Sequence, residues 1–180
     1  MKILKLIAVI ALPLVLLSAC SSTQSLQEYF VDSSENPNFL SADLPVSLLN
    51  LEKVDLNAEE KDALASLQKL NVLAFKKAAD NAMEYDVEKK KVKAILKRDK
   101  FNELMRMNTS YGKATIKYLG ENDAIDEVII YGDNKEKGFL LVRVLGDDMN
   151  PAHIMQFIKA IQKSDYKGEG LGELGEFIRG

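Results

Sequence analysis

The sequence predicts an α+β domain, with an antiparallel sheet of about four strands and helices packed on it. Three apolar segments with strand character, at residues 111–119, 127–131 and 138–145, are separated by short turn-forming clusters. Such short connections leave room only for antiparallel neighbours. A buried strand and a helix precede these three strands and a helix follows them. The predicted order is therefore strand, helix, three strands, helix, after helical N-terminal material.

The N-terminal part of the domain contains short apolar segments between turn residues. Residues 26–31 suit a short helix or strand, and Asn36-Pro37 ends it. Residues 39–42 suit a short extended piece. Residues 44–51 are apolar, and we expect them to be helical with Pro45 in the first turn.

A helix start signal and a buried strand come next. Asn57 is an N-cap residue with Glu60 three positions later, which predicts a short helix through Ala65. The continuous apolar character of residues 67–75 predicts a buried strand.

Residues 87–96 have helical spacing, which extends after Asp99 to Met107. The same segment carries a run of lysines: Lys89, Lys90, Lys91 and Lys93. A membrane or nucleic-acid surface is one interpretation of such a run. Four acids offset the charge locally, which favours a solvated helix face: Glu84, Asp86, Glu88 and Asp99.

The C-terminal half contains the central strand and the last predicted helix. Residues 139–145 are apolar on both faces except at Arg143, so we place this strand in the middle of the sheet. Asn150-Pro151 then caps and starts a helix. Its apolar stripe comprises Ile154, Met155, Phe157, Ile158 and Ile161.

Residues 1–19 have the features of a bacterial lipoprotein signal. Two lysines precede an apolar run at residues 6–17, which is shorter than the roughly 20 residues of a stable span. Small residues ending in Ala19 then stand before Cys20, the only cysteine. We expect cleavage between Ala19 and Cys20 and acyl chains on the Cys20 thiol. An ordinary secretory signal cut after Ala19 is the alternative, although it would leave a free thiol.

The formal charge of the mature chain limits the kinds of partner that it can bind. Cleavage removes two of the 24 basic side chains and none of the 27 acids, so the mature chain has a formal charge of −5. This disfavours nucleic acid, because phosphate binding needs a positive surface. With one cysteine, no internal disulfide can form.

The residues after Cys20 indicate where the protein is held. Residues 20–25 are the lipidated cysteine and a polar tether. Ser21 is not the Asp that favours inner-membrane retention in well-studied Gram-negative bacteria, and no acidic cluster follows. We therefore expect the outer membrane, with the domain, residues 26–167, facing the periplasm.

Residues 26–161 resemble the domain-of-unknown-function 4252 family, found mostly as lipoproteins of Bacteroidota. The resemblance is carried by the segments 101–105 (FNELM), 112–118 (GKATIKY), 125–130 (IDEVII) and 140–146 (LLVRVLG). The resemblance implies localisation as a lipoprotein and an α+β fold. It implies no activity, catalytic residue or cofactor.

Three sets of residues invite a metal or catalytic interpretation. His153 is the only histidine, and a zinc site without a second histidine or a free cysteine would need an oxygen-rich set, so we expect neither a metal nor a catalytic role. Residues 133–138 suit a calcium loop poorly, because Lys135 and Lys137 stand where oxygen ligands are needed. We expect a hairpin turn there. Asp147 and Asp148 precede a helix amino terminus, where the macrodipole favours them, and alone offer too few ligands for calcium.

The glycine-rich tail, residues 168–180, has apolar residues near helical spacing. A weakly ordered end is expected, because glycine costs about 1 kcal/mol per helix position relative to alanine. A segment that folds on a partner is the alternative.

These observations predict a cell-envelope lipoprotein of unknown molecular activity, most simply a non-enzymatic binding or structural module with an envelope protein as partner. No cofactor is expected. One alternative is an envelope hydrolase that uses a pair of carboxylates, although nothing selects a pair among the 27 acids. Another is a component that senses envelope stress.

Overall fold

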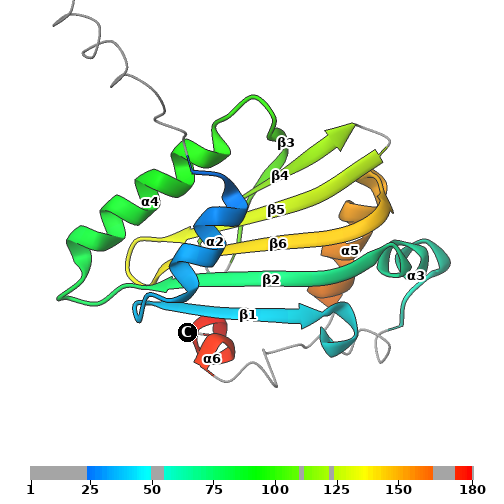
Figure 1. Ribbon diagram of the computed structural model, residues 1–180. Coiled ribbons are helices and arrows are strands. Elements are labelled where there is room, and N and C mark those ends of the chain that lie inside the picture. The colour runs from blue at the N-terminus through cyan, green and yellow to red at the C-terminus, as the bar shows by residue number, and fades with distance from the viewer. Residues whose placement is uncertain (1–23, 50–54, 110–111, 122–123, 164–172, 180) are drawn as a thin grey trace, which may run out of the picture.

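Six antiparallel strands form one sheet in the part of the chain that the computed structural model describes, residues 24–49, 55–109, 112–121, 124–163 and 173–179 (Figure 1). Their order across the sheet is β1-β2-β6-β5-β4-β3. The strands are β1 (Phe39–Pro45), β2 (Leu67–Lys76), β3 (Asn102–Asn108), β4 (Lys113–Glu121), β5 (Ala124–Asn134) and β6 (Gly138–Met149). The helices are α2 (Leu26–Ser34), the 3-10 helix η2 (Val46–Leu49), α3 (Ala58–Ala65), α4 (Ala82–Leu96), α5 (Pro151–Lys163) and α6 (Glu173–Arg179).

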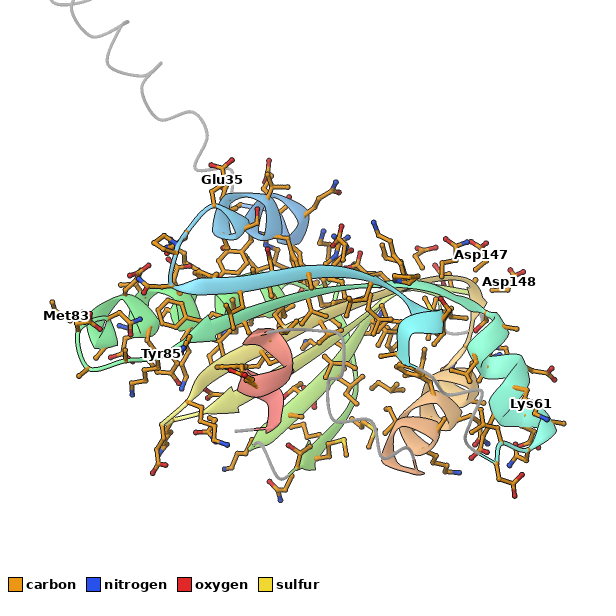
Figure 2. All side chains as sticks on the ribbon, turned by 90° about the horizontal axis from the view of Figure 1, so that it is seen from below. Glu35, Lys61, Met83, Tyr85, Asp147 and Asp148 are labelled. Carbon is orange, nitrogen blue, oxygen red and sulfur yellow. The ribbon has the colours of Figure 1, made fainter. Side chains whose placement is uncertain are left out.

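Helices cover both faces of the sheet, as Figures 1 and 2 show. Helices α2 and α4 lie on one face, and α5 and α6 lie on the other. Helix α3 packs beside α5 at one end. The α+β class is therefore confirmed.

Two hydrophobic cores arise because successive side chains of a strand point to opposite faces. In β2, Leu73 and Phe75 pack under α2 and α4, while Val72 belongs to the core under α5. In β6, Leu141 and Val142 divide in the same way. The α2/α4 side is the more aromatic of the two, with ring centroids between 5.0 and 6.2 Å apart among Tyr29, Phe39, Phe75, Tyr85, Tyr131 and Phe139.

The four interior strands were all predicted. β2, β4, β5 and β6 occur where the sequence predicts strands; β2, β5 and β6 are longer than expected, and β4 has the expected length but begins and ends two residues later. β6 lies between β2 and β5, so the central position inferred from its two apolar faces is confirmed.

The strand count was wrong because both edge strands were missed or shortened. The helical spacing predicts that the preceding helix continues to Met107, but residues 102–108 form β3, which pairs with β4, with Arg106 opposite Thr115 and Met107 opposite Ala114. Its side chains are only exposed or half-buried, so its sequence lacks the clear two-residue alternation of a half-buried strand.

The helix expected over residues 44–51 is also wrong at its start. Leu44 and Pro45 continue β1, opposite Leu70 and Lys69 of β2. Proline is tolerated there because β1 is an edge strand. Only the short 3-10 helix η2 follows, and residues 50–54 lie outside the described part of the chain.

Local capping signals were reliable. Helix α3 has the expected box: the Glu60 backbone N–H donates to Asn57 Oδ1 at 2.8 Å, and the Asn57 N–H donates to Glu60 Oε2 at 3.0 Å. Helix α5 starts at Pro151 as predicted, and the His153 N–H donates to Asn150 Oδ1 at 2.9 Å. Helix α4 begins earlier than predicted, at Ala82.

Part of the tail belongs to the folded domain. Residues 173–179 form α6, which contacts β1 and buries Leu174, so the weakly ordered end expected there is wrong for this segment. Residues 164–172 and 180 lie outside the described part. None of the described helices combines the length and apolar character that a membrane crossing requires.

Candidate functional site

The predicted lipidation site, Cys20, and its cleavage partner, Ala19, lie outside the described residues. The described chain begins at Gln24, just before α2. The backbone carbonyl of Gln24 accepts a hydrogen bond from the Arg98 guanidinium, directly after α4. This contact holds the start of α2 beside the C-terminal end of α4, as Figure 1 shows.

His153 lies in the first turn of α5 and is half-buried. Its Nδ1 atom is buried and has no hydrogen-bond partner among the described atoms. Within the described ranges, no group of three or more His, Cys, Asp or Glu side chains is placed to hold a metal ion.

Asp147 and Asp148 precede α5 as expected, and they form part of the end of β6. Both are exposed at one end of the sheet in Figure 2. Asp147 accepts a hydrogen bond from Gln68 Nε2 at 2.5 Å, and Asp148 has a left-handed backbone with φ 52°. Asn150, and neither of the two acids, caps α5.

The hairpin turn predicted at residues 133–138 is confirmed. Asn134 Oδ1 accepts from the backbone N–H groups of Glu136 and Lys137 at 2.9 and 3.0 Å. Gly138 has φ 123°, and a Cβ atom there would lie 1.9 Å from the Phe75 carbonyl oxygen. Only glycine fits this position without strain.

A groove of about 590 Å³ lies between α2 and the strands β1, β2 and β6. We call it the α2 groove. Its walls include Phe30, Val31, Asp43, Lys69, Asn71 and Arg143. Val31 is 60% exposed and adds apolar area to the wall of the groove. Mixed apolar and polar walls of this kind suit recognition of a partner with both kinds of surface.

A strip of polar side chains crosses the sheet at this groove. Asn71 lies opposite Asp43 on one side and Arg143 on the other. The Asn71 amide donates to Asp43, and Arg143 donates two hydrogen bonds to Glu127 of β5, from Nε at 2.7 Å and from Nη2 at 2.9 Å. The Arg143 guanidinium also lies 5.5 Å from the centroid of the Phe30 ring.

The strip is partly buried and internally paired. Asn71 is 8% exposed and Glu127 is 9% exposed. Buried polar groups held in this way have fixed orientations, because any other rotamer would leave a polar atom without a partner. The α2 groove is therefore a preorganised surface.

A second groove of about 410 Å³ lies between α4 and the strands β3, β4 and β5. We call it the α4 groove. Its walls include Lys93, Arg106, Lys113, Thr115, Tyr131 and Asp133. Three cations face one carboxylate, so an anion is the ligand that its charge favours.

Asp133 is held by a cluster at the inner end of the α4 groove. Lys89 Nζ lies 2.7 Å from Asp133 Oδ2, and the Tyr85 hydroxyl donates to Asp133 Oδ1 at 2.8 Å. Lys89 also donates to the Tyr85 hydroxyl oxygen at 3.0 Å. Burial raises the pKa of the Tyr85 phenol. Partial burial acts to lower the pKa of Lys89, but the hydrogen bonds to Asp133 and Tyr85 outweigh it and raise that pKa.

Sequence reasoning missed both grooves. Arg143 was noticed only as the polar exception in an apolar strand, and Asp133 only as part of a turn. The strip joins residues 43, 71, 127 and 143, which are brought together by strand pairing alone. No spacing pattern in the sequence marks such a set.

The fold and surface define a class of protein: an α+β domain with a six-stranded antiparallel sheet in its described part, covered by helices on both faces, with the polar α2 and α4 grooves among its surface features. The chain belongs to the family called domain of unknown function (DUF4252), whose profile matches residues 29–157. The family resemblance drawn from the sequence is thereby confirmed. No curated protein and no solved structure matches the chain.

Proposed function

We propose that this chain is a lipid-anchored protein of the cell envelope whose domain binds another envelope component through the α2 groove, without catalysing a reaction. The anchor is Cys20, and the preferred location is the outer membrane on its periplasmic side. The observation that carries the binding proposal is the preorganised polar strip, from Asp43 to Glu127, beneath the exposed Val31.

The anchor is supported by the sequence alone. A short apolar run followed by Ala19-Cys20 matches a lipoprotein signal, and several acyl chains on one thiol give stable membrane residence. Metabolic labelling with a fatty-acid probe tests it directly. Label should enter the natural protein and be absent from Cys20→Ala. Equal labelling of the two, or an uncleaved natural precursor, would overturn the anchor.

The binding role is supported by how the groove is built. Arg143 in this groove is already paired with Glu127 within the protein, so a partner meets a partly preorganised surface and little entropy is lost on ordering these two side chains. Phe30 and Val31 add apolar area beside the polar strip. Aromatic and apolar anchors next to fixed polar groups are characteristic of recognition surfaces.

The hydrolase alternative gains no support from the grooves. A carboxylate mechanism needs two acids on opposite sides of the scissile bond. Of the residues described as lining them, the α2 groove has Asp43 as its carboxylate and the α4 groove has Asp133. Asp133 is moreover engaged by Tyr85 and Lys89.

Site-specific photocrosslinking tests the binding role. A photoreactive amino acid placed at Val31 in the full-length protein, expressed in its native envelope, should give a discrete adduct. The same group at Lys61, an exposed residue of α3 at the far end of the sheet, serves as the control (Figure 2).

The adduct should weaken when Lys69, on the groove wall, is changed in Lys69→Glu. It should persist in a chain carrying Lys159→Glu, a charge reversal at an exposed position of α5. The same adducts from Val31 and Lys61, or none from Val31, would rule out the α2 groove as the binding surface.

A further inference from the structure

The outer face of α4 carries a row of lysines. Lys90, Lys93 and Lys97 are spaced three and four residues apart, so they lie on one side of the helix. Lys100 follows in the turn after α4. All four are exposed, and none forms an ion pair with another residue in the described ranges.

Two of the four acids that lie near these lysines in the sequence are engaged elsewhere. Glu84 accepts hydrogen bonds from Asn36 and Asn38, each at 2.7 Å. Glu88 is 7% exposed and binds Lys91 at 2.6 Å. Exposed acids remain at residues 86 and 99, near either end of the row. The lysine face therefore keeps a local positive charge.

The α4 groove extends this positive surface onto the sheet. Lys93 lines the groove together with Arg106 of β3 and Lys113 of β4. Arg106 also binds the exposed Glu103 at 2.8 Å, and both side chains face solvent. A groove of about 410 Å³ with such walls can admit a phosphate group.

Compensation of the helix macrodipole explains only part of this charge. Cations stabilise the last turn of a helix, which accounts for Lys93. Lys90 lies before that turn, and Arg106 and Lys113 lie on separate strands. The macrodipole therefore does not account for Lys90, Arg106 and Lys113.

The proposed anchor places this basic surface near a membrane. Arg98 binds the carbonyl of Gln24 at the C-terminal end of α4. Four residues lead from Cys20 to Gln24, and an extended chain of that length spans at most about 14 Å. A lipid on Cys20 thus keeps Lys97 and its neighbours close to the bilayer surface.

We propose that the α4 basic surface, consisting of Lys90, Lys93, Lys97, Lys100, Arg106 and Lys113, binds the headgroups of anionic phospholipids in the membrane that holds Cys20. This inference rests on the proposed lipid anchor. Clusters of four to eight basic residues beside a membrane attachment point bind anionic lipid in this way. Asp32 of α2 and Glu35, its C-cap residue, are exposed acids that an anionic surface repels, so the contact involves α4 and leaves α2 turned away from the bilayer.

A fluorescence experiment on the lipidated, full mature protein tests the inference. The protein is reconstituted in vesicles of phosphatidylcholine, either pure or with about 30% phosphatidylglycerol, that carry a headgroup quencher. A single reporter is placed on Ala94→Cys of α4 or, as the matched control, on Ala152→Cys of α5. Both alanines are exposed positions on helices on opposite sides of the sheet.

On vesicles with phosphatidylglycerol, the reporter at position 94 should be quenched roughly threefold more than the reporter at position 152. The difference should disappear on pure phosphatidylcholine and in Lys93→Glu/Lys97→Glu. It should remain in Lys61→Glu/Lys159→Glu, which changes the net charge equally.

Flotation of the vesicles distinguishes a failure of the lipid anchor from a failure of the headgroup contact. Protein that fails to float in every sample contradicts the lipid anchor itself. Protein that floats, with equal quenching at both positions or the same difference on neutral vesicles, overturns the headgroup contact and leaves the anchor standing.

Discussion

Arg143 and Glu127 form a two-pronged ion pair between neighbouring strands of the sheet, with N···O distances of 2.7 and 2.9 Å. The side chains are 13% and 12% exposed, so the pair is largely removed from water. It lies on the α2 side, where the other inward-facing positions of β6, Phe139 and Leu141, are apolar. This pair fixes the polar strip that forms part of the α2 groove.

Arg143→Met should lower the free energy of unfolding by about 3 kcal/mol, because it leaves the Glu127 carboxylate buried without its partner. The double variant Arg143→Met/Glu127→Leu should recover most of that loss. Lys69→Ala, which removes an exposed contact of 3.8 Å to Asp43, should cost less than about 0.5 kcal/mol. Urea denaturation measures all three, and a double variant no more stable than the single one would contradict the explanation.

Asn57→Ala should destabilise the protein by about 1 kcal/mol, since it removes the acceptor that caps α3. Ser25→Ala tests the same principle at α2, where the Ser25 hydroxyl accepts from the Glu28 N–H at 3.1 Å. The capping carboxylate also benefits: hydrogen bonds from Ser25 hold the pKa of Glu28 below its usual value. Hydrogen exchange should show the added opening in the first turn of α3 for Asn57→Ala, and unchanged exchange there would count against the cap.

Stability should fall as the pH rises above 10. Burial raises the pKa values of Tyr29 and Tyr85 above the usual 10.0, so these phenols ionise first in the unfolded chain. The raised pKa of Lys89 has the same effect, because its contribution is complete below 10.5 and is lost as the pH passes its folded pKa.

Denaturant titrations between about pH 9 and 11.5 measure this loss. In the double variant Tyr85→Phe/Lys89→Met, the free energy of unfolding should fall less steeply with pH than in the natural protein. The part of the fall that Tyr29 causes should remain. An equally steep fall in the double variant would exclude the cluster around Asp133 as a source of the dependence.

Gly138→Ala should cost about 2 kcal/mol, because the β5–β6 hairpin needs a positive φ there and the new Cβ would meet the Phe75 carbonyl. Lys135→Ala, at an exposed position in the same turn, is the control and should change stability by less than about 0.5 kcal/mol. Thermal unfolding of the two variants distinguishes a backbone effect from a general sensitivity of the turn.

The elements that could be predicted share one property, which is a signal contained within a few residues. The box of Asn57 and Glu60 starts α3, and Asn150-Pro151 starts α5. Turn clusters separate the strands β4, β5 and β6. These signals depend on backbone groups three or four positions away, so the surrounding fold changes them little.

The edge strands β1 and β3 were not fully predicted because their signal comes from distant segments of the chain. Met105 and Met107 belong to a strand because β4 lies beside them, whereas their local sequence also suits a helix. Pro45 suits the start of a helix equally well, and only pairing with Lys69 makes it part of β1. Tertiary pairing overrides a weak local preference when the two alternatives are close in free energy.

The candidate sites also could not be predicted from the sequence. Residues 43, 71, 127 and 143 have no common motif, and Tyr85 reaches Asp133 only because α4 packs over β5. The sequence of α4 predicts a solvated lysine face, and Lys90, Lys91 and Lys93 are exposed. It could not show that hydrogen bonding and burial engage Glu84 and Glu88.

Apolar periodicity and capping act over short chain separations, so they were enough to predict the α+β class, the four interior strands and the starts of α3 and α5. The resemblance of four segments identified the family. The tertiary structure was needed to establish the two edge strands, the docking of α6 on β1, and the side chains that meet in the α2 and α4 grooves. These depend on which distant segments pair, and that choice is made by burying both faces of the sheet at once.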